Sequence, residues 1–272
     1  MSLLNYTPKS PLSTYVESIW RMSSDGLPSS RHRICPNGTM GLVIHLANRN
    51  LVYFDAAGRQ SVRVPLLAGP YSTSFLIDPS EYTAVLGVRF RPGAARVFFP
   101  VQAHELHNID VPLKDLYPRE AALLYEQVLA AGSPSAQFHV LESYLLSKLP
   151  AKVPPQPAVA HAVREFLRQP GARAIADVQS EIGLSHTRFI QVFRESVGLT
   201  PKLFCRIQRF RTAVQQIENG LSVSWADLAA ACGYFDQAHL IHDFRKFSGI
   251  TPGAFAEQRV EFSTIHTRNH SA

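Results

Sequence analysis

Residues 175–201, IADVQSEIGLSHTRFIQVFRESVGLTP, return in altered form at 225–252 as WADLAAACGYFDQAHLIHDFRKFSGITP. Each copy contains an Ala-Asp pair near its start and ends with Gly-x-Thr-Pro. Between these motifs each copy has a glycine, Gly183 or Gly233, and the two glycines lie 50 residues apart. Such internal similarity indicates that this part of the chain contains the same structural unit twice.

Each copy is typical of a helix-turn-helix unit. A first helix ends at the glycine, which readily adopts a left-handed backbone conformation. Ser185 in one copy and Asp236 in the other then supply the oxygen that caps a second helix. Phe189 and Phe193 lie four residues apart, so they share one face of that helix and are expected to be buried. The second helix of such a unit can enter the major groove of DNA.

The opposite faces of the two second helices carry the candidate DNA contacts. Glutamine matches the edge of adenine and arginine the edge of guanine, so polar residues there are expected to face bases. The base-facing candidates are Thr187, Arg188, Ile190, Gln191, Gln237, Ala238, His239 and His242. The candidates for contact with DNA phosphates are Ser185, Arg194, Lys202, Arg206, Arg209, Arg245 and Lys246.

Charge and composition agree with a nucleic-acid partner. The 272 residues have a formal net charge of +6, which favours a polyanionic partner. Residues 201–219 are predicted to form one helix that joins the two units, and no acidic residue occurs between Glu195 and Glu218. With 46% hydrophobic residues the chain can form packed cores. Its three scattered cysteines do not suit a disulfide framework or a four-ligand zinc site.

The chain is predicted to have two domains, separated by a proline-rich linker at 151–157, AKVPPQP. Residues 158–272 are expected to be helical. Residues 1–150 are expected to form an antiparallel β barrel or sandwich, closed by a helical hairpin that begins at about 116. The stretches predicted as strands are 40–47, 51–54, 61–67, 74–77 and 83–90. The two helices of the hairpin are predicted at 119–131 and 135–148.

Three motifs carry a resemblance to a known family: 206–210 (RIQRF), 233–237 (GYFDQ) and 244–252 (FRKFSGITP). Residues of about 158–262 resemble the DNA-binding domain of AraC/XylS-type transcription regulators, which is a pair of helix-turn-helix units joined by a linker helix. The resemblance implies a bacterial one-component regulator in the cytoplasm, in which a sensor domain is fused to a domain that binds double-stranded DNA.

The N-terminal half resembles the cupin-like regulatory domain of an uncharacterised AraC subgroup. The motifs that carry this resemblance are 36–38 (PNG), 87–93 (GVRFRPG) and 104–106 (HEL). It implies that this half binds a small-molecule effector or mediates dimerisation. A second copy of the chain and RNA polymerase are therefore candidate partners. The helix at 135–148 either pairs with its copy in a dimer or packs on the β domain.

Four residues depart from the family pattern. Gln179 stands where a small residue is usual and is expected to loosen the packing of the first unit. Gln191 and His242 stand where arginine is common, and Asp243 adds a negative charge beside the second recognition helix. We therefore expect the second unit mainly to contact phosphates, which position a protein on DNA without reading its sequence.

Other classes of function were weighed against these motifs. In the alternative interpretation the N-terminal half is a cupin-like ligand-binding or metal enzyme domain, and the helices form an interaction module. Such a metal site needs clustered His and carboxylate ligands. His104 and His107 lie three apart, but no carboxylate follows at a suitable spacing, so we expect no metal, no cofactor and no catalytic residue. No segment is long and apolar enough to suggest a membrane span.

Candidates for effector binding come from the β domain, because the mouth of a β barrel is a common ligand site. They are His45, Tyr53, Phe75 and Phe90. Cys35 is either a redox-sensing thiol or, as a lone cysteine more often is, a small buried apolar residue.

Overall fold

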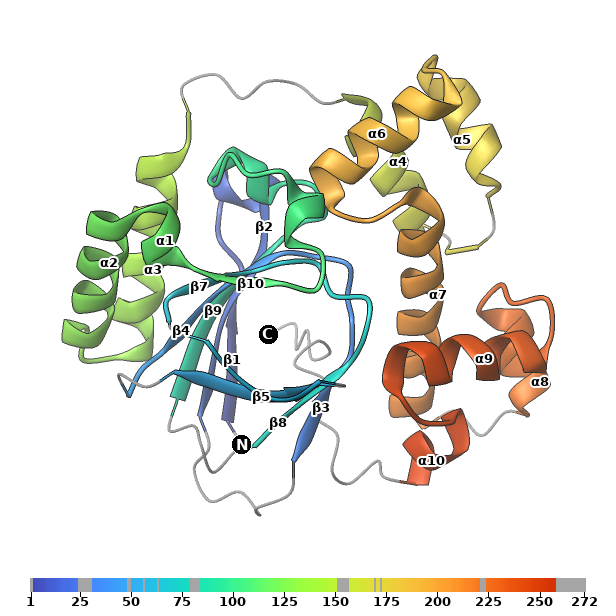
Figure 1. The fold of residues 1–272 in the computed structure, drawn as a ribbon, viewed down its shortest axis with the longest axis horizontal. Coiled ribbons are helices and arrows are strands. Elements are labelled where there is room, and N and C mark those ends of the chain that lie inside the picture. Colours follow the sequence, from blue (N-terminus) through green and yellow to red (C-terminus); the bar gives the residue numbers. More distant parts are fainter. Residues whose placement is uncertain are drawn as a thin grey trace.

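The computed structural model describes residues 2–23, 31–47, 50–55, 57–62, 64–78, 84–150, 157–168, 170–171, 173–220 and 224–257. These residues form an antiparallel β domain followed by a helical domain, as the sequence predicts (Figure 1). The predicted linker lies outside the described residues except for Pro157, which begins the helix α4. None of the described helices has the length and apolar character that a membrane span requires.

The β domain consists of two antiparallel sheets. The larger has the strand order β1-β2-β9-β4-β7-β10 and the smaller the order β3-β8-β5-β6. The strands are β1 (Ser2–Tyr6), β2 (Val16–Ser23), β3 (His32–Ile34), β4 (Gly41–His45), β5 (Leu51–Asp55), β6 (Gly58–Val62), β7 (Leu66–Ala68), β8 (Phe75–Ile77), β9 (Ala84–Phe90) and β10 (Asp110–Pro112).

The α-helices of the described residues fall into two groups, one in the N-terminal domain and one in the C-terminal domain. The first group is α1 (Leu113–Leu116), α2 (Pro118–Ala130) and α3 (Pro134–Lys148). The second group is α4 (Pro157–Arg168), α5 (Ile175–Ile182), α6 (His186–Val197), α7 (Pro201–Glu218), α8 (Trp225–Ala231), α9 (Gln237–Ser248) and α10 (Pro252–Glu257). Short 3-10 helices are η1 (Leu12–Thr14), η3 (Ala95–Val97) and η4 (Ala103–Leu106).

The predicted strands are present, with one difference. The stretch 61–67 was expected to be a single strand, but it contributes to two, β6 and β7, on either side of Pro65. A proline has no N–H to donate to a neighbouring strand, so the ladder is interrupted at this residue. Consequently β6 belongs to the smaller sheet and β7 to the larger one. The strands β1, β2, β3 and β10 lie outside the stretches that the sequence predicted as strands.

The helices α2 and α3 pack against the larger sheet, on the side away from the helical domain (Figure 1). The buried residues Leu124 and Val128 of α2 and Leu141 and Leu145 of α3 join one core with Phe90 of β9. This arrangement agrees with the packing role that the sequence allowed for 135–148.

The core of the helical domain is built from phenylalanines around α7. The ring of Phe193 in α6 lies 5.7 Å from that of Phe204 in α7. Further along α7, the ring of Phe210 lies 5.0 Å from that of Phe244 in α9. All four side chains are fully buried. Aromatic pairs at such distances contribute about 0.5–1.5 kcal/mol beyond the burial of their area. The helix α7 therefore holds both second helices, α6 and α9, in place.

Gly87 in β9 allows the indole of Trp20 to lie directly on the larger sheet. The two residues are paired in register between β2 and β9. A Cβ atom at position 87 would lie 2.3 Å from Cζ2 of Trp20. This is too close for any contact between carbon atoms, so the ring or the strand would have to move.

We predict that Gly87→Ala lowers the free energy of unfolding by about 1–3 kcal/mol, the usual cost of overpacking a core. The measurement is urea unfolding followed by tryptophan fluorescence. Gly132→Ala is the matched control, because a Cβ atom there meets nothing within 4 Å. Equal stability of the two variants would show that the sheet and Trp20 adjust freely.

Candidate nucleic-acid interface and ligand cavity

The first repeat forms a capped helix-turn-helix. The helix α5 ends at Gly183, whose φ of 71° is left-handed. The hydroxyl of Ser185 then accepts a hydrogen bond from the backbone N–H of Arg188 and caps α6. Gln179, expected to loosen this unit, instead donates from Nε2 to the carbonyl oxygen of Leu184 over 2.9 Å. The side chain of Gln179 therefore connects α5 to the turn that follows it.

The second repeat has the same plan. The chain turns at Gly233, with a φ of 74°, after α8. Oδ1 of Asp236 accepts a hydrogen bond of 2.7 Å from the backbone N–H of His239 and caps α9. The buried face of α9 includes Leu240 and Phe244, which occupy the places of Phe189 and Phe193 in α6.

The base-facing candidates lie on the surfaces of α6 and α9. Ile190 and His239 are half-buried, and the remaining six are exposed: Thr187, Arg188, Gln191, Gln237, Ala238 and His242. Gln191 accepts a hydrogen bond from Arg188 and donates one to Glu195. Both bonds join exposed side chains, so a base edge can replace them at little cost.

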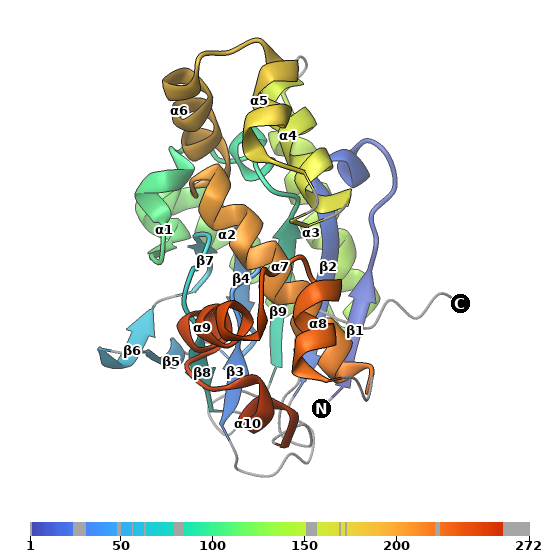
Figure 2. The same cartoon turned by 90° about the vertical axis from the view of Figure 1, so that its right-hand side faces the viewer.

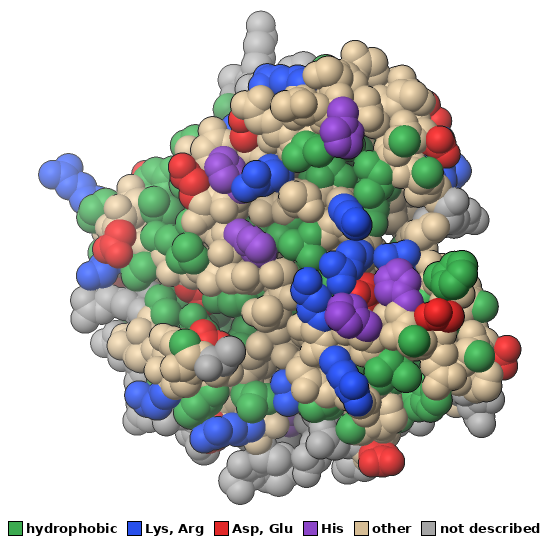
Figure 3. Space-filling view, turned by 45° about the vertical axis from the view of Figure 1, so that its right-hand side comes forward, with side chains coloured by type: hydrophobic (Ala, Val, Ile, Leu, Met, Phe, Trp, Pro, Cys, Tyr) green, Lys and Arg blue, Asp and Glu red, His purple; other side chains and the backbone are tan. Residues whose placement is uncertain are grey.

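Five of the phosphate candidates are exposed. Four of them are basic, Arg194, Lys202, Arg245 and Lys246, and the fifth is Ser185, the cap of α6. Figure 3 views the molecule with the helical domain turned toward the reader. It shows basic and histidine side chains gathered on one part of the surface.

The two remaining phosphate candidates, Arg206 and Arg209, make contacts within the protein. Arg206 donates from Nη2 to Oδ1 of Asp243 over 2.5 Å, and the side chain of Asp243 is 0% exposed. Arg209 donates to the carbonyl oxygen of Gly233, and its guanidinium lies 5.0 Å from the ring centroid of Tyr234. Both arginines of α7 therefore fix the second unit in place.

Asp243 was expected to add a negative charge beside the recognition helix. Its carboxylate is instead buried and paired with Arg206, so the exposed face of α9 does not carry that charge. The sequence offered no signal for this pairing, because the two residues lie 37 positions apart on different helices.

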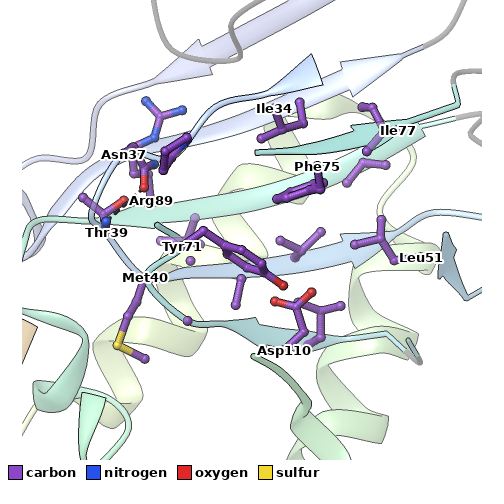
Figure 4. A pocket seen from close by; sticks show the side chains of 18 of the residues that line it. Ile34, Asn37, Thr39, Met40, Leu51, Tyr71, Phe75, Ile77, Arg89 and Asp110 are labelled. Atoms are coloured by element: carbon purple, nitrogen blue, oxygen red, sulfur yellow. Dashed lines mark hydrogen bonds between the residues drawn. The ribbon is translucent and has the colours of Figure 1, made fainter. Parts of the chain in front are cut away.

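An apolar cavity of about 140 Å³ lies inside the β domain (Figure 4). Its apolar walls include Trp20, Met22, Ile34, Val43, Leu51, Leu66, Phe75, Ile77 and Val85. Polar groups are few and stand at two places: Asn37, Thr39 and Arg89 at one, and Tyr71 and Asp110 at the other.

Of the four effector-pocket candidates, Phe75 lines this cavity. Tyr53 stands behind it, where its hydroxyl accepts a hydrogen bond of 3.4 Å from Tyr71. His45 and Phe90 do not line the cavity. Nδ1 of His45 accepts the N–H of Ala47 in the turn after β4, and Phe90 points from β9 into the core beneath the helices α2 and α3.

Tyr71, Asp110 and Asn37 were not among the sequence candidates, although all three line the cavity. Burial raises the pKa of Asp110 to about 6, and a hydrogen bond from Tyr71 opposes this rise. The strand β10 that carries Asp110 has three residues, too few for an alternating pattern to mark the residue in the sequence.

Three segments that line the cavity also touch the helical domain. Next to Tyr71, Pro70 is so close to Gly198 that a Cβ atom on this glycine would lie 2.4 Å from the proline ring. Next to Phe75, the hydroxyl of Ser74 donates to the carbonyl oxygen of Ser248 over 3.0 Å. These contacts join the cavity wall to the C-terminal ends of α6 and α9 respectively.

The third segment joins β3 to β4 and contacts the middle of α7, which runs alongside the β domain (Figure 2). The carbonyl oxygen of Asn37 accepts a hydrogen bond of 3.1 Å from Nε2 of Gln208. The next residue, Gly38, has a φ of 73°, and a Cβ atom there would lie 3.3 Å from the ring of Phe204.

Cys35 belongs to this same segment and is buried with the core of the helical domain. Burial raises the pKa of its thiol to about 12. A thiol reacts through its thiolate, so Cys35 is unreactive at neutral pH and acts as a packing residue.

Of the two histidines weighed as metal ligands, His104 and His107, the second makes a contact of another kind. Nε2 of His107 lies 2.9 Å from the hydroxyl of Ser72. Within the described ranges no three His, Cys, Asp or Glu side chains are grouped so that they would hold a metal ion.

Comparison with known families matches both domains. Residues 160–258 match the model of a helix-turn-helix domain, and residues 4–112 match a domain of unknown function (DUF6597). The C-terminal domain is an AraC-type DNA-binding domain with two helix-turn-helix units. The chain is accordingly a DNA-binding transcription regulator.

Similar solved structures include regulators of this type. An AraC-type transcriptional regulator from Chromobacterium violaceum shares 23% identity over 39% of this chain and 95% of its own, with a TM-score of 0.36. Apo ToxT K231A from Vibrio cholerae shares 10% identity over 88% of this chain and 97% of its own, with a TM-score of 0.49. A search of proteins of curated function found no match.

Arg206 points inward and pairs with Asp243, whereas Lys202 is exposed, so we expect Arg206 to stabilise the fold and Lys202 to contact DNA. We predict that Arg206→Ala lowers the free energy of unfolding by about 3–5 kcal/mol, because it removes the hydrogen-bonded cation from the buried carboxylate of Asp243 and leaves beside it only the imidazole of His239, 4.0 Å away. Lys202→Ala is predicted to leave stability within about 0.5 kcal/mol, since its side chain is exposed.

The measurement is urea unfolding of the helical signal in circular dichroism. Unchanged stability of Arg206→Ala would mean that water solvates Asp243 and that Arg206 is free for DNA.

Proposed function

We propose that the chain reads DNA through the exposed faces of α6 and α9, and that a small effector in the β-domain cavity changes this binding. The observation that carries the first part is the pair of capped recognition helices held on one central helix, α7. Bases are read by Thr187, Arg188, Gln191 and the exposed start of α9. The phosphates are held by Arg194, Lys202, Arg245 and Lys246.

The effector part rests on the three shared segments. Each of them lines the cavity on one side and touches one helix on the other: 68–71 at α6, 35–38 at α7 and 74–75 at α9. A ligand that shifts any of these segments changes the position of a recognition helix or of the helix between them. Packed interiors transmit such shifts because they contain few voids to absorb them.

The other proposed partners follow from the regulator role. A second copy of the chain is proposed to bind the second half of a DNA site, and RNA polymerase is the machinery on which the bound regulator acts. We also propose that the regulator acts in the cytoplasm, because bacterial DNA lies there.

The exposed charges predict a steep dependence of DNA binding on salt. The four exposed basic residues assigned to phosphates, Arg194, Lys202, Arg245 and Lys246, would release about four counterions from duplex DNA. Affinity should then fall on the order of 150-fold between 50 and 200 mM salt. Fluorescence anisotropy with a labelled duplex measures this. Lys202→Ala should reduce the slope of log K against log salt by about 1, and a flat salt profile would contradict the phosphate assignment.

Gln191 is predicted to read a base. Selection of random duplexes on the full-length chain should enrich two half-elements about one helical turn apart. With Gln191→Ala, preference at one base position should relax by about 1–3 kcal/mol while the salt slope stays the same. Gln127→Ala, on an exposed face of α2, is the matched control and should enrich the original motif. A loss of affinity that is equal for all sequences would remove Gln191 from the base readers.

A further inference from the structure

The cavity of the β domain contains one carboxylate in an otherwise largely apolar wall, that of Asp110 (Figure 4). Oδ1 of this residue is buried and has no hydrogen-bond partner among the described residues. The hydroxyl of Tyr71 points toward the same carboxylate. Tyr71 compensates this carboxylate only in part, and a buried carboxylate oxygen that loses its hydration is costly unless a cation or a donor meets it.

Arg89 is a cation in the cavity wall, but it does not pair with Asp110. Arg89 stands beside Asn37, at a distance from Asp110 across the cavity (Figure 4). Its Nη1 lies 3.9 Å from Oε1 of Glu17, so this charge is balanced by another carboxylate. The free oxygen of Asp110 is therefore left to face the cavity.

The ring of Tyr71 stands next to Asp110 (Figure 4), and further aromatic rings line the same cavity. The ring of Phe75 lies 5.1 Å from that of Tyr71 and 5.1 Å from that of Tyr53, and Trp20 also lines the cavity. Faces of aromatic rings attract cations within about 6 Å of their centroids. A carboxylate in a cavity lined by aromatic rings is the chemistry that recognises an ammonium group on an apolar body.

The size of the cavity limits the ligand. Its volume of about 140 Å³ is close to that of an apolar cavity of ~150 Å³ that binds benzene. The space therefore suits a body of about one six-membered ring with a short substituent.

We propose that the cavity binds a small primary amine with a monocyclic apolar body, whose ammonium group donates to Oδ1 of Asp110. This inference rests on the proposed effector role of the cavity and adds the chemical class of the effector. The hydroxyl of Tyr71 orients the carboxylate, and Trp20 and Phe75 cover the apolar body.

The test compares three probes that share one ring and differ in the head group: benzylamine, benzyl alcohol and benzoate. Binding to the full-length chain is measured at pH 7.5 by calorimetry and by the shift of the thermal midpoint. Benzylamine is expected to bind at least about tenfold more tightly than either of the others, as a charge-assisted hydrogen bond requires.

Two variants assign the effect to the carboxylate. Asp110→Asn should weaken benzylamine about tenfold or more and leave benzyl alcohol within about twofold. Asp115→Asn is the matched control, because that carboxylate is exposed on the neighbouring helix α1. It should leave all three probes unchanged.

The other outcomes are distinguishable. Equal binding of benzylamine and benzyl alcohol, insensitive to Asp110→Asn, would keep the cavity as an effector site and overturn the amine proposal. Tightest binding of benzoate would overturn it in favour of recognition by Arg89. Failure of every probe to bind would overturn the amine proposal, and DNA selection with the same protein then tests separately whether the regulator role stands.

Discussion

Phe204 in α7 has neighbours in both domains. Its ring packs against Phe193 of the first helix-turn-helix unit, and it also lies close to Gly38 of the β domain, where a Cβ atom would be 3.3 Å from the ring. One turn further along α7, Gln208 donates to the carbonyl oxygen of Asn37. Close-packed interiors cannot absorb displacements locally, so α7 cannot move relative to the β domain without moving the units that it carries. The spacing of the two recognition helices, and thus the DNA that they fit, depends on this contact.

The sequence was sufficient to predict the helical domain because the domain repeats itself. Two copies of a glycine, a capping residue and a closing Gly-x-Thr-Pro predicted both units, and Ser185 and Asp236 cap α6 and α9 as expected. The sequence was a poorer guide to which cations face outward. Arg206 and Arg209 lie in a basic stretch, but whether such a side chain meets solvent or a buried acceptor depends on a residue of another helix. Asp243 is that acceptor for Arg206, and no spacing rule connects the two.

The β domain was predicted only in outline, and the reason is the length of its strands. β3, β7, β8 and β10 have three residues each, too few for alternation to distinguish an inward from an outward face. Phe75 was recognised as an aromatic residue of the cavity, whereas Asp110 was not, since an isolated aspartate next to a short apolar run gives no sign of its burial. Non-local pairing of strands determines that Asp110 and Tyr71 meet at one wall, and the sequence alone does not specify this pairing.

A ligand in the cavity can alter DNA binding only if it binds one arrangement of the domains more tightly than another. The three shared segments provide such a difference, because each is held on both sides. Pro70 touches the end of α6, Asn37 touches α7, and Ser74 touches the end of α9. Burial of Oδ1 of Asp110 without a hydrogen-bond donor is unfavourable, and an ammonium group that donates to this oxygen, as proposed above, relieves that energy. Coupling between two sites in a protein typically amounts to about 1–3 kcal/mol. If part of the binding energy at Asp110 is coupled in this way, the affinity for DNA changes by about tenfold. The buried carboxylate of Asp110 thus supplies binding energy for the ligand. The shared segments couple part of this energy to the positions of the recognition helices.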